Sequence, residues 1–223
     1  MKDKIIIFGA GKISEVISTY LKLDDEFEIC AYVVDAKYLE SETFLDRPLI
    51  SEEEAFKKYS PKQYKCFIAL GYHNNNLLRK EKFELFKNKG YRFVNYIDKK
   101  IRIDVEVGEN VFIMDDALIQ PKVKIGNNVF IFGGAMVGHH SNIKDNCWIT
   151  GGALIGGSVI IGDSTFLAMG TTVAHETHVG KNCFLGANIL VSKNLPDNSV
   201  VIKSDTDILR LNTEQFLKIT KLK

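Results

Sequence analysis

The chain has 223 residues, of which 45% are hydrophobic, and its 29 basic and 28 acidic side chains leave a formal net charge of +1. This near-neutral balance argues against nucleic acid or an anionic membrane surface as the main partner. No apolar run approaches the roughly 20 residues of a membrane-spanning helix, and the apolar stretch near Met1 is too short for a signal peptide. The composition therefore indicates a soluble chain long enough for two modest domains.

Residues 1–98 alternate short apolar runs with amphipathic stretches, a pattern typical of a small parallel sheet connected by helices. In chain order it predicts a strand over Lys4–Phe8, a helix over Ile13–Leu23, a strand over Phe27–Val34, a short helix opened by the capping pair Ser51 and Glu54, a strand over Lys65–Leu70, a helix over Leu77–Lys89 and a strand over Tyr91–Tyr96. About four strands are too few for a full dinucleotide-binding fold.

The turn after the first strand consists of Gly9, Ala10, Gly11 and Lys12. Free amides at a helix N-terminus attract anions, so this turn is suited to a phosphate group. Ser14 replaces the third glycine of the dinucleotide motif, which disfavours NAD. We expect a sugar or nucleotide-sugar here, and the alternative is a turn with a structural role only.

Three further residues follow other predicted strands of the same sheet. Asp35 ends the second strand, and Gly71 and His73 follow the third. Ligand contacts gather at the carboxyl ends of parallel strands, so these residues are expected to join the glycine turn in one acceptor site.

A six-residue repeat runs without insertion from Ile101 to Pro196. Every sixth residue from Ile101 to Val191 is a branched aliphatic, and the position four residues later is always small or aliphatic. This hexapeptide pattern predicts a parallel β-helix, in which three hexads form one coil of a triangular prism and residues eighteen apart stack on one face.

Two outward columns of the predicted prism are apolar. One column is aromatic and consists of Phe112, Phe130, Trp148, Phe166 and Phe184, and its neighbour consists of Leu118, Met136, Leu154, Thr172 and Leu190. Apolar stripes of this length do not stay in water. We expect the prisms to associate about a threefold axis, and the alternative is cover by the N-terminal domain or the C-terminal tail.

The four cysteines lie far apart, and Cys147 and Cys183 occupy inward positions of the prism. A thiol in such a position acts as a small apolar side chain. This usage favours a reducing cytoplasm over disulfides or a thiolate nucleophile.

His139 and His175 are thirty-six residues apart and share an outward column with Gly157 between them. The usual strand spacing puts the two histidines about 10 Å apart. The adjacent column contains His140 and Glu176. One interpretation makes an imidazole the general base for an attacking amine or hydroxyl, while a backbone amide polarises a thioester carbonyl.

The alternative interpretation is a metal held by histidines across a subunit interface. The spacing of His139 and His175, with His178 shortly after, is similar to that of the gamma-class carbonic anhydrases, although that family places its third histidine five residues on. This alternative would make the chain a trimeric hydratase. A third possibility is a trimeric scaffold without catalytic activity.

The whole chain up to about residue 200 resembles the bacterial sugar acetyltransferases of the sialic acid O-acetyltransferase and bacillosamine N-acetyltransferase group, which also includes perosamine N-acetyltransferases. The motifs that carry the resemblance are Phe8–Gly11, Ala69–Gly71 with Arg79 after it, Val137–His140 and Val179–Gly186. The resemblance implies a homotrimer, acetyl-CoA as co-substrate between adjacent prisms, no metal, and a sugar or nucleotide-sugar on the N-terminal domain.

The resemblance also implies roles for individual residues. The family's general base falls on His139 and its oxyanion amide on Gly157, while its acidic partner to the base is replaced by His140. A histidine that the bacillosamine enzymes use near the coenzyme falls on Trp148, so that contact must differ or be absent. The residues expected at the coenzyme are Trp148, Gly157, His175 and Gly186.

The sequence therefore predicts an α/β Rossmann-like acceptor domain over 1–98, a left-handed parallel β-helix for acyl transfer over 99–200, and a short helical tail over 201–223. The expected activity is transfer of an acetyl group to an amino or hydroxyl group of a sugar destined for surface glycan.

Overall fold

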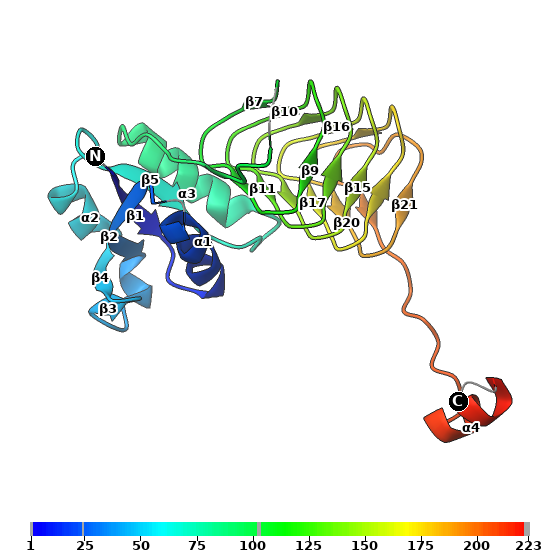
Figure 1. The fold of residues 1–223 in the computed structure, drawn as a ribbon. Coiled ribbons are helices and arrows are strands. Elements are labelled where there is room, and N and C mark those ends of the chain that lie inside the picture. Colours follow the sequence, from blue (N-terminus) through cyan, green and yellow to red (C-terminus); the bar gives the residue numbers. More distant parts are fainter. Residues whose placement is uncertain (1, 24, 102–103, 221–223) are drawn as a thin grey trace.

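The computed structural model describes residues 2–23, 25–101 and 104–220. A small α/β domain comes first, a long β-helix follows, and a short helix ends the chain (Figure 1). The predicted fold class is confirmed.

The N-terminal domain is built on a five-stranded sheet in the order β3, β4, β2, β1, β5. The elements are β1 (Asp3–Phe8), α1 (Lys12–Leu23), β2 (Phe27–Val34), a 3-10 turn (Ala36–Tyr38), β3 (Thr43–Phe44), β4 (Arg47–Ser51), α2 (Glu52–Lys58), β5 (Lys65–Ile68) and α3 (Leu77–Asn88). All neighbouring strands are parallel except β3, which is antiparallel to β4. Helix α2 begins as predicted, because the hydroxyl of Ser51 accepts a hydrogen bond from the Glu54 N–H at 3.2 Å.

Two differences from the predicted strands have simple causes. Strand β4 was not predicted, because its apolar core is only Leu49 and Ile50 and proline at position 48 is unusual in a strand. The strand expected over Tyr91–Tyr96 is wrong: only Phe93 bridges to β5, and β6 (Tyr96–Ile97) pairs with the prism instead.

The prism has three parallel sheets, which we name by their outward surfaces. The polar face consists of β7 (Glu106–Val107), β10 (Lys124–Ile125), β13 (Asn142–Ile143), β16 (Ile160–Ile161) and β19 (His178–Val179). The domain face consists of β6, β8 (Phe112–Ile113), β11 (Phe130–Ile131), β14 (Trp148–Ile149), β17 (Phe166–Leu167), β20 (Phe184–Leu185) and β22 (Val200–Val201). The aliphatic face consists of β9 (Leu118–Ile119), β12 (Met136–Val137), β15 (Leu154–Ile155), β18 (Thr172–Val173) and β21 (Leu190–Val191).

Residues eighteen apart pair in register throughout the prism, as Phe130 does with Trp148. The inward aliphatic residues form one continuous buried cluster along the axis, with Ile131, Ile149 and Leu167 fully buried on the domain face. This axial core holds each coil in line with the next, and it therefore determines which outward residues stack above one another.

The N-terminal domain covers the aromatic column of the domain face. Phe112 and Phe130 are fully buried, and Trp148 and Phe166 are at most 5% exposed, within a cluster that also contains Ile17 and other residues of the N-terminal domain. The expectation that this column packs about a threefold axis is thus wrong. The neighbouring column stays open in the single chain, with Leu118 55%, Leu154 43% and Leu190 67% exposed.

Arg79 on α3 joins the two domains. Its guanidinium is fully buried, lies 4.4 Å from the ring centroid of Phe130 and 5.1 Å from that of Trp148, and donates to the carbonyl oxygens of Asn146 (2.9 Å) and Cys147 (3.2 Å). Burial lowers its pKa to about 9, so it remains charged at neutral pH. No carboxylate pairs with it among the described residues, and cation–π contact and the two carbonyls stabilise the charge instead.

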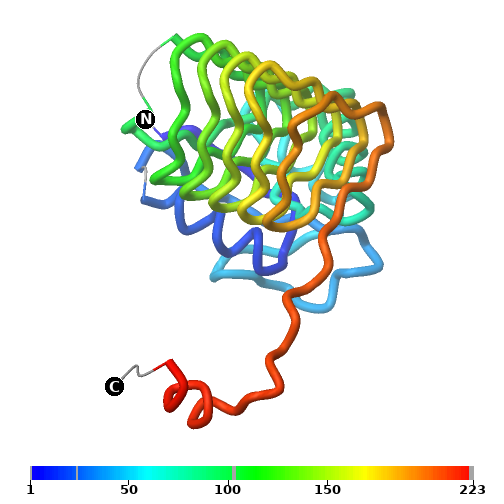
Figure 2. The backbone as a smooth tube through the Cα atoms, turned by 90° about the vertical axis from the view of Figure 1, so that its right-hand side faces the viewer, coloured from blue at the N-terminus to red at the C-terminus, as the bar shows by residue number. Residues whose placement is uncertain are grey.

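After β22 the chain leaves the prism and runs away from both domains to α4 (Thr213–Thr220), as Figures 1 and 2 show. Asn212 caps this helix, since its side-chain oxygen accepts from the Gln215 N–H at 2.9 Å. None of the described helices combines the length and apolar character needed to cross a membrane.

We predict that Arg79→Ala lowers the free energy of unfolding by about 2–4 kcal/mol. It leaves a cavity at the junction and removes the hydrogen-bond donor of the Asn146 carbonyl, whereas the Cys147 carbonyl keeps its bond from the Phe130 N–H. Trp148 is the only tryptophan, so urea unfolding can be followed by its fluorescence. On unfolding, water reaches the indole and the emission should shift to the red. Lys80→Ala, one residue further along α3 at an exposed position, is the control. Equal unfolding midpoints for the two variants would contradict this role for Arg79.

Candidate active site

The predicted histidine site lies on one corner of the prism, in the turn over 138–141 that connects β12 on the aliphatic face to β13 on the polar face. His139 and His140 are both exposed there. The next two coils place Gly157 and His175 above His139, and the ladder bond from the Ser158 N–H to the His139 carbonyl (2.8 Å) ties the first two turns together.

The two adjacent histidines are in contact through their rings. The Nδ1 atoms of His139 and His140 lie 3.1 Å apart, so one ring donates a hydrogen bond to the other. The backbone N–H of His139 donates to Oε1 of Gln120 on the preceding coil at 2.9 Å. His140 therefore occupies the position where the resemblance expects an acidic partner, and its ring contacts His139.

The rings of His139 and His175 lean toward each other across Gly157. Their centroids are 6.3 Å apart, closer than the 10 Å expected from strand spacing alone. A Cβ atom at position 157 would lie 2.7 Å from Cε1 of His139, so only glycine leaves room for this ring. His175 is itself held by Glu176, with 3.2 Å between Nε2 and Oε1.

The backbone N–H of Gly157 is free to bind a developing negative charge. Its backbone N–H donates to no acceptor among the described residues, although its carbonyl accepts from the Glu176 N–H at 3.0 Å. A free amide beside an imidazole is the arrangement that can stabilise an oxyanion while a proton moves.

The predicted acceptor residues gather at one edge of the N-terminal sheet. Gly9, Asp35 and the segment ending at Gly71 follow β1, β2 and β5, which are neighbouring parallel strands. Gly9 has φ +126°, and a Cβ there would lie 2.6 Å from the Ala69 carbonyl oxygen, whereas a Cβ at Gly11 would meet nothing within 4 Å.

The side chains around this edge differ in how free they are to contact a ligand. Lys12 and His73 are exposed, and Ala10 is half-buried against the prism. The carboxylate of Asp35 is paired with Lys82, which also binds Glu52 at 2.8 Å. Asp35 thus has a structural partner on α3, and Lys82 is a residue that the sequence pattern did not single out.

Trp148 is only 2% exposed, because the N-terminal domain covers it. Its indole contacts Arg79 and lies 5.5 Å from the ring of Tyr72, so it has no surface for a coenzyme, and the expectation of such a contact is corrected. Gly186 lies on a different corner, between β20 and β21, in a groove lined also by Ile202 and Lys203. Neither residue joins the histidine cluster in a single chain.

The histidine corner and the acceptor edge lie on opposite sides of the prism. The N-terminal domain covers the domain face, and the turn over 138–141 forms the corner between the other two faces. In a triangular prism that corner is opposite the domain face. One chain therefore carries both halves of the expected site without bringing them together.

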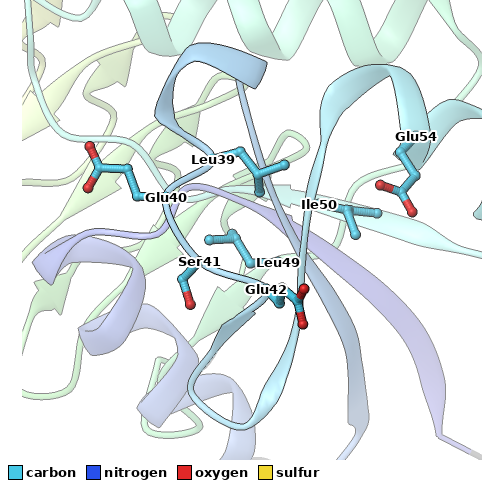
Figure 3. A pocket seen from close by; sticks show the side chains of 7 residues that line it. All are labelled: Leu39, Glu40, Ser41, Glu42, Leu49, Ile50 and Glu54. Atoms are coloured by element: carbon cyan, nitrogen blue, oxygen red, sulfur yellow. The ribbon is translucent and has the colours of Figure 1, made fainter.

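Other features of the surface do not match the expected chemistry. A pocket beside β3 and β4 is lined by Leu39, Glu40, Ser41, Glu42, Leu49, Ile50 and Glu54 (Figure 3). Three glutamates repel a phosphate, which disfavours a nucleotide-sugar there. Burial raises the pKa of Cys147 to about 12, so its thiol stays protonated. The described part of the chain contains no group of three or more side chains arranged to hold a metal ion.

Two family models match the chain. The PglD N-terminal domain matches residues 4–86, and the bacterial transferase hexapeptide model, with six repeats, matches residues 104–139. A search of curated proteins finds no match.

Solved structures match over almost the full length. A variant of perosamine N-acetyltransferase from Caulobacter crescentus, in complex with CoA and GDP-perosamine, is 25% identical with a TM-score of 0.80, and the match covers 91% of this chain and 97% of that one. The acetyltransferase domain of PglB from Neisseria gonorrhoeae, in complex with acetyl coenzyme A, is 20% identical with a TM-score of 0.79, covering 90% and 96%. WeeI from Acinetobacter baumannii is 17% identical with a TM-score of 0.70, covering 91% and 97%.

The chain is a hexapeptide-repeat acyltransferase. The resemblance to the sugar acetyltransferase group is confirmed in both domains, by the N-terminal model and by the structural match along the whole chain. The hexapeptide register predicted the column that His139 and His175 share, but it did not single out Gln120, whose side chain accepts from the His139 N–H. The register could have pointed to Gln120, because this residue lies eighteen positions before Gly138 and therefore one coil below the turn that contains His139.

The two glycines of the acceptor turn should respond differently to substitution. We predict that Gly9→Ala lowers the free energy of unfolding by about 1–3 kcal/mol, because an L side chain is strained at this φ and clashes with a backbone oxygen. Gly11→Ala should change it by less than about 0.5 kcal/mol. Urea unfolding of both variants tests this difference, and equal effects would contradict it.

Proposed function

We propose that this acyltransferase moves an acetyl group from acetyl-CoA to an amino or hydroxyl group of a sugar, most favourably one linked to a nucleotide. The observation that carries the proposal is the free N–H of Gly157 directly beside the ring of His139. The structural relative from Caulobacter crescentus, which binds CoA and GDP-perosamine, supports both the coenzyme and the class of acceptor.

In the proposed reaction His139 is the general base. The acceptor nitrogen or oxygen attacks the thioester carbonyl carbon, and its proton passes to Nε2 of His139. The N–H of Gly157 donates to the oxyanion of the tetrahedral intermediate. The carbon–sulfur bond then breaks, and the proton on His139 passes to the leaving thiolate, so no covalent enzyme intermediate forms.

A homotrimer is part of the proposal, because the two halves of the site lie on opposite sides of one chain. The exposed leucines of the aliphatic face adjoin the histidine corner and are suited to pack against a second copy. Such packing would bring the acceptor edge of one chain to the histidines of its neighbour. A cytoplasmic location and a role in surface glycan synthesis complete the proposal.

The metal-dependent hydratase is kept as an alternative because His175 and His178 follow His139 after two coils, a spacing similar to that of the gamma-class carbonic anhydrases. His178 is on the polar face, paired in register with Ile160, whereas His139 and His175 are on the corner. Elemental analysis of the purified protein distinguishes the two. Stoichiometric zinc without acetyl-CoA binding would favour the hydratase.

The activity is tested by incubating the protein with acetyl-CoA and a panel of UDP-, GDP- and TDP-amino sugars, and then measuring by mass spectrometry which sugar gains an acetyl group. We predict that His139→Ala lowers kcat on that sugar by about 10²–10⁴, since a general base contributes this much. His178→Ala, on the polar face, is the matched control and should retain activity. Near-normal turnover by His139→Ala, with its oligomeric state unchanged, would exclude this residue as the base.

A further inference from the structure

We propose that His140 positions His139 for base catalysis through a hydrogen bond between two neutral imidazoles, in place of the carboxylate that commonly orients a catalytic histidine. This inference rests on the proposed function of His139. With a neutral imidazole as the partner of His139, the activity depends on pH in a way that a carboxylate partner would not produce.

The geometry of the pair is that of a ring-to-ring hydrogen bond. The two Nδ1 atoms are 3.1 Å apart, and the ring planes are nearly perpendicular at 84°. A bond between two Nδ1 atoms needs one of them protonated and the other bare. The pair therefore contains one shared proton at this contact.

Backbone contacts hold both residues in this arrangement. The His139 N–H donates to Oε1 of Gln120 at 2.9 Å, and the His140 N–H donates to the Pro121 carbonyl at 3.3 Å. His140 has φ 60°, in the left-handed region, as do Ser158 and Glu176 at the same position of later coils. The left-handed turn is thus a regular feature of this column of the corner.

Only one of the two tautomers makes His139 a base. If Nδ1 of His139 carries the shared proton and donates it to His140, Nε2 of His139 keeps a free lone pair. No described residue forms a hydrogen bond to that Nε2, and a Cβ at Gly157 would lie 2.9 Å from it. Nε2 of His139 is thus available to take a proton from the acceptor.

An imidazole partner and a carboxylate partner of His139 respond differently when the pH falls. Once Nδ1 of His140 is protonated it has no lone pair and can only donate to Nδ1 of His139. That reversed bond requires the proton of His139 to be on Nε2, so His139 loses the lone pair that makes it a base. The ionisable groups in the same two columns of neighbouring coils are Lys122, which pairs with Asp104, on the coil below, and His175 with Glu176, 3.2 Å apart, above. Activity should therefore be lost when either imidazole takes up a proton.

The first test is the tautomer itself. Long-range ¹H–¹⁵N spectra of the ¹⁵N-labelled protein at neutral pH, assigned with His139→Gln and His140→Asn, should show His139 protonated at Nδ1 and bare at Nε2. A proton on Nε2 of His139 overturns the proposal. This measurement needs no substrate, so it tests the pair even if no sugar is acetylated, and the failure of one proposal can be told from the failure of the other.

The second test is the acid limb of the kcat/KM profile. In the unaltered enzyme, the limb should steepen toward two protons, a loss of about a hundredfold per pH unit. His140→Asn keeps an acceptor oxygen near the position of Nδ1 and tolerates a left-handed turn, so it should remain active with a one-proton limb. The variant His140→Glu should also show an acid limb with a one-proton slope. Glutamate is the residue found at the equivalent position 176, two coils later.

If the acid limb of the kcat/KM profile had the same slope in the unaltered enzyme and in His140→Asn, the proposal that His140 positions His139 would be contradicted. A purely structural role for His140 would change the amount of folded protein or kcat at every pH, without altering the number of protons in the limb. Circular dichroism of each variant across the pH range controls for unfolding.

Discussion

The stacking of inward aliphatic side chains along the prism axis is the constraint on which the rest of this structure depends. Because residues such as Ile131 and Ile149 lie directly above one another, coils cannot slip, and residues eighteen apart stay in register. That register places Gly157 between His139 and His175, where its N–H has no acceptor among the described residues. The chemistry of the corner is thus a consequence of hydrophobic packing several residues away.

The periodic part of the fold could be predicted from sequence because each coil contacts mainly its neighbours. The columns, the glycine between the histidines and the glycine turn at Gly9 all follow from local spacing. The cover of the aromatic column could not be predicted in the same way. It depends on how a separate domain docks, and the buried guanidinium of Arg79 against Phe130 and Trp148 is a contact between residues far apart in the chain.

The sequence pattern also could not predict the directions of the side chains at the histidine corner. Strand spacing predicts histidines 10 Å apart, yet left-handed turns and the missing side chain of Gly157 let the rings of His139 and His175 approach to 6.3 Å. The contact of His139 with His140 has the same origin. In this protein an imidazole stands where a carboxylate was expected, and the backbone of the turn, held by Gln120, makes that substitution workable.

The central claim is that two chains build one site, with the acceptor turn from one and the histidine corner from the other. The most direct measurement mixes two inactive variants, His139→Ala and Gly11→Trp, the second chosen because position 11 faces open space and a bulky side chain there would block the turn without disturbing the fold. After the two are unfolded together and refolded, acetyl transfer should return, because some neighbouring chains then contribute one intact half each. A mixture that stays as inactive as its components would contradict a shared site.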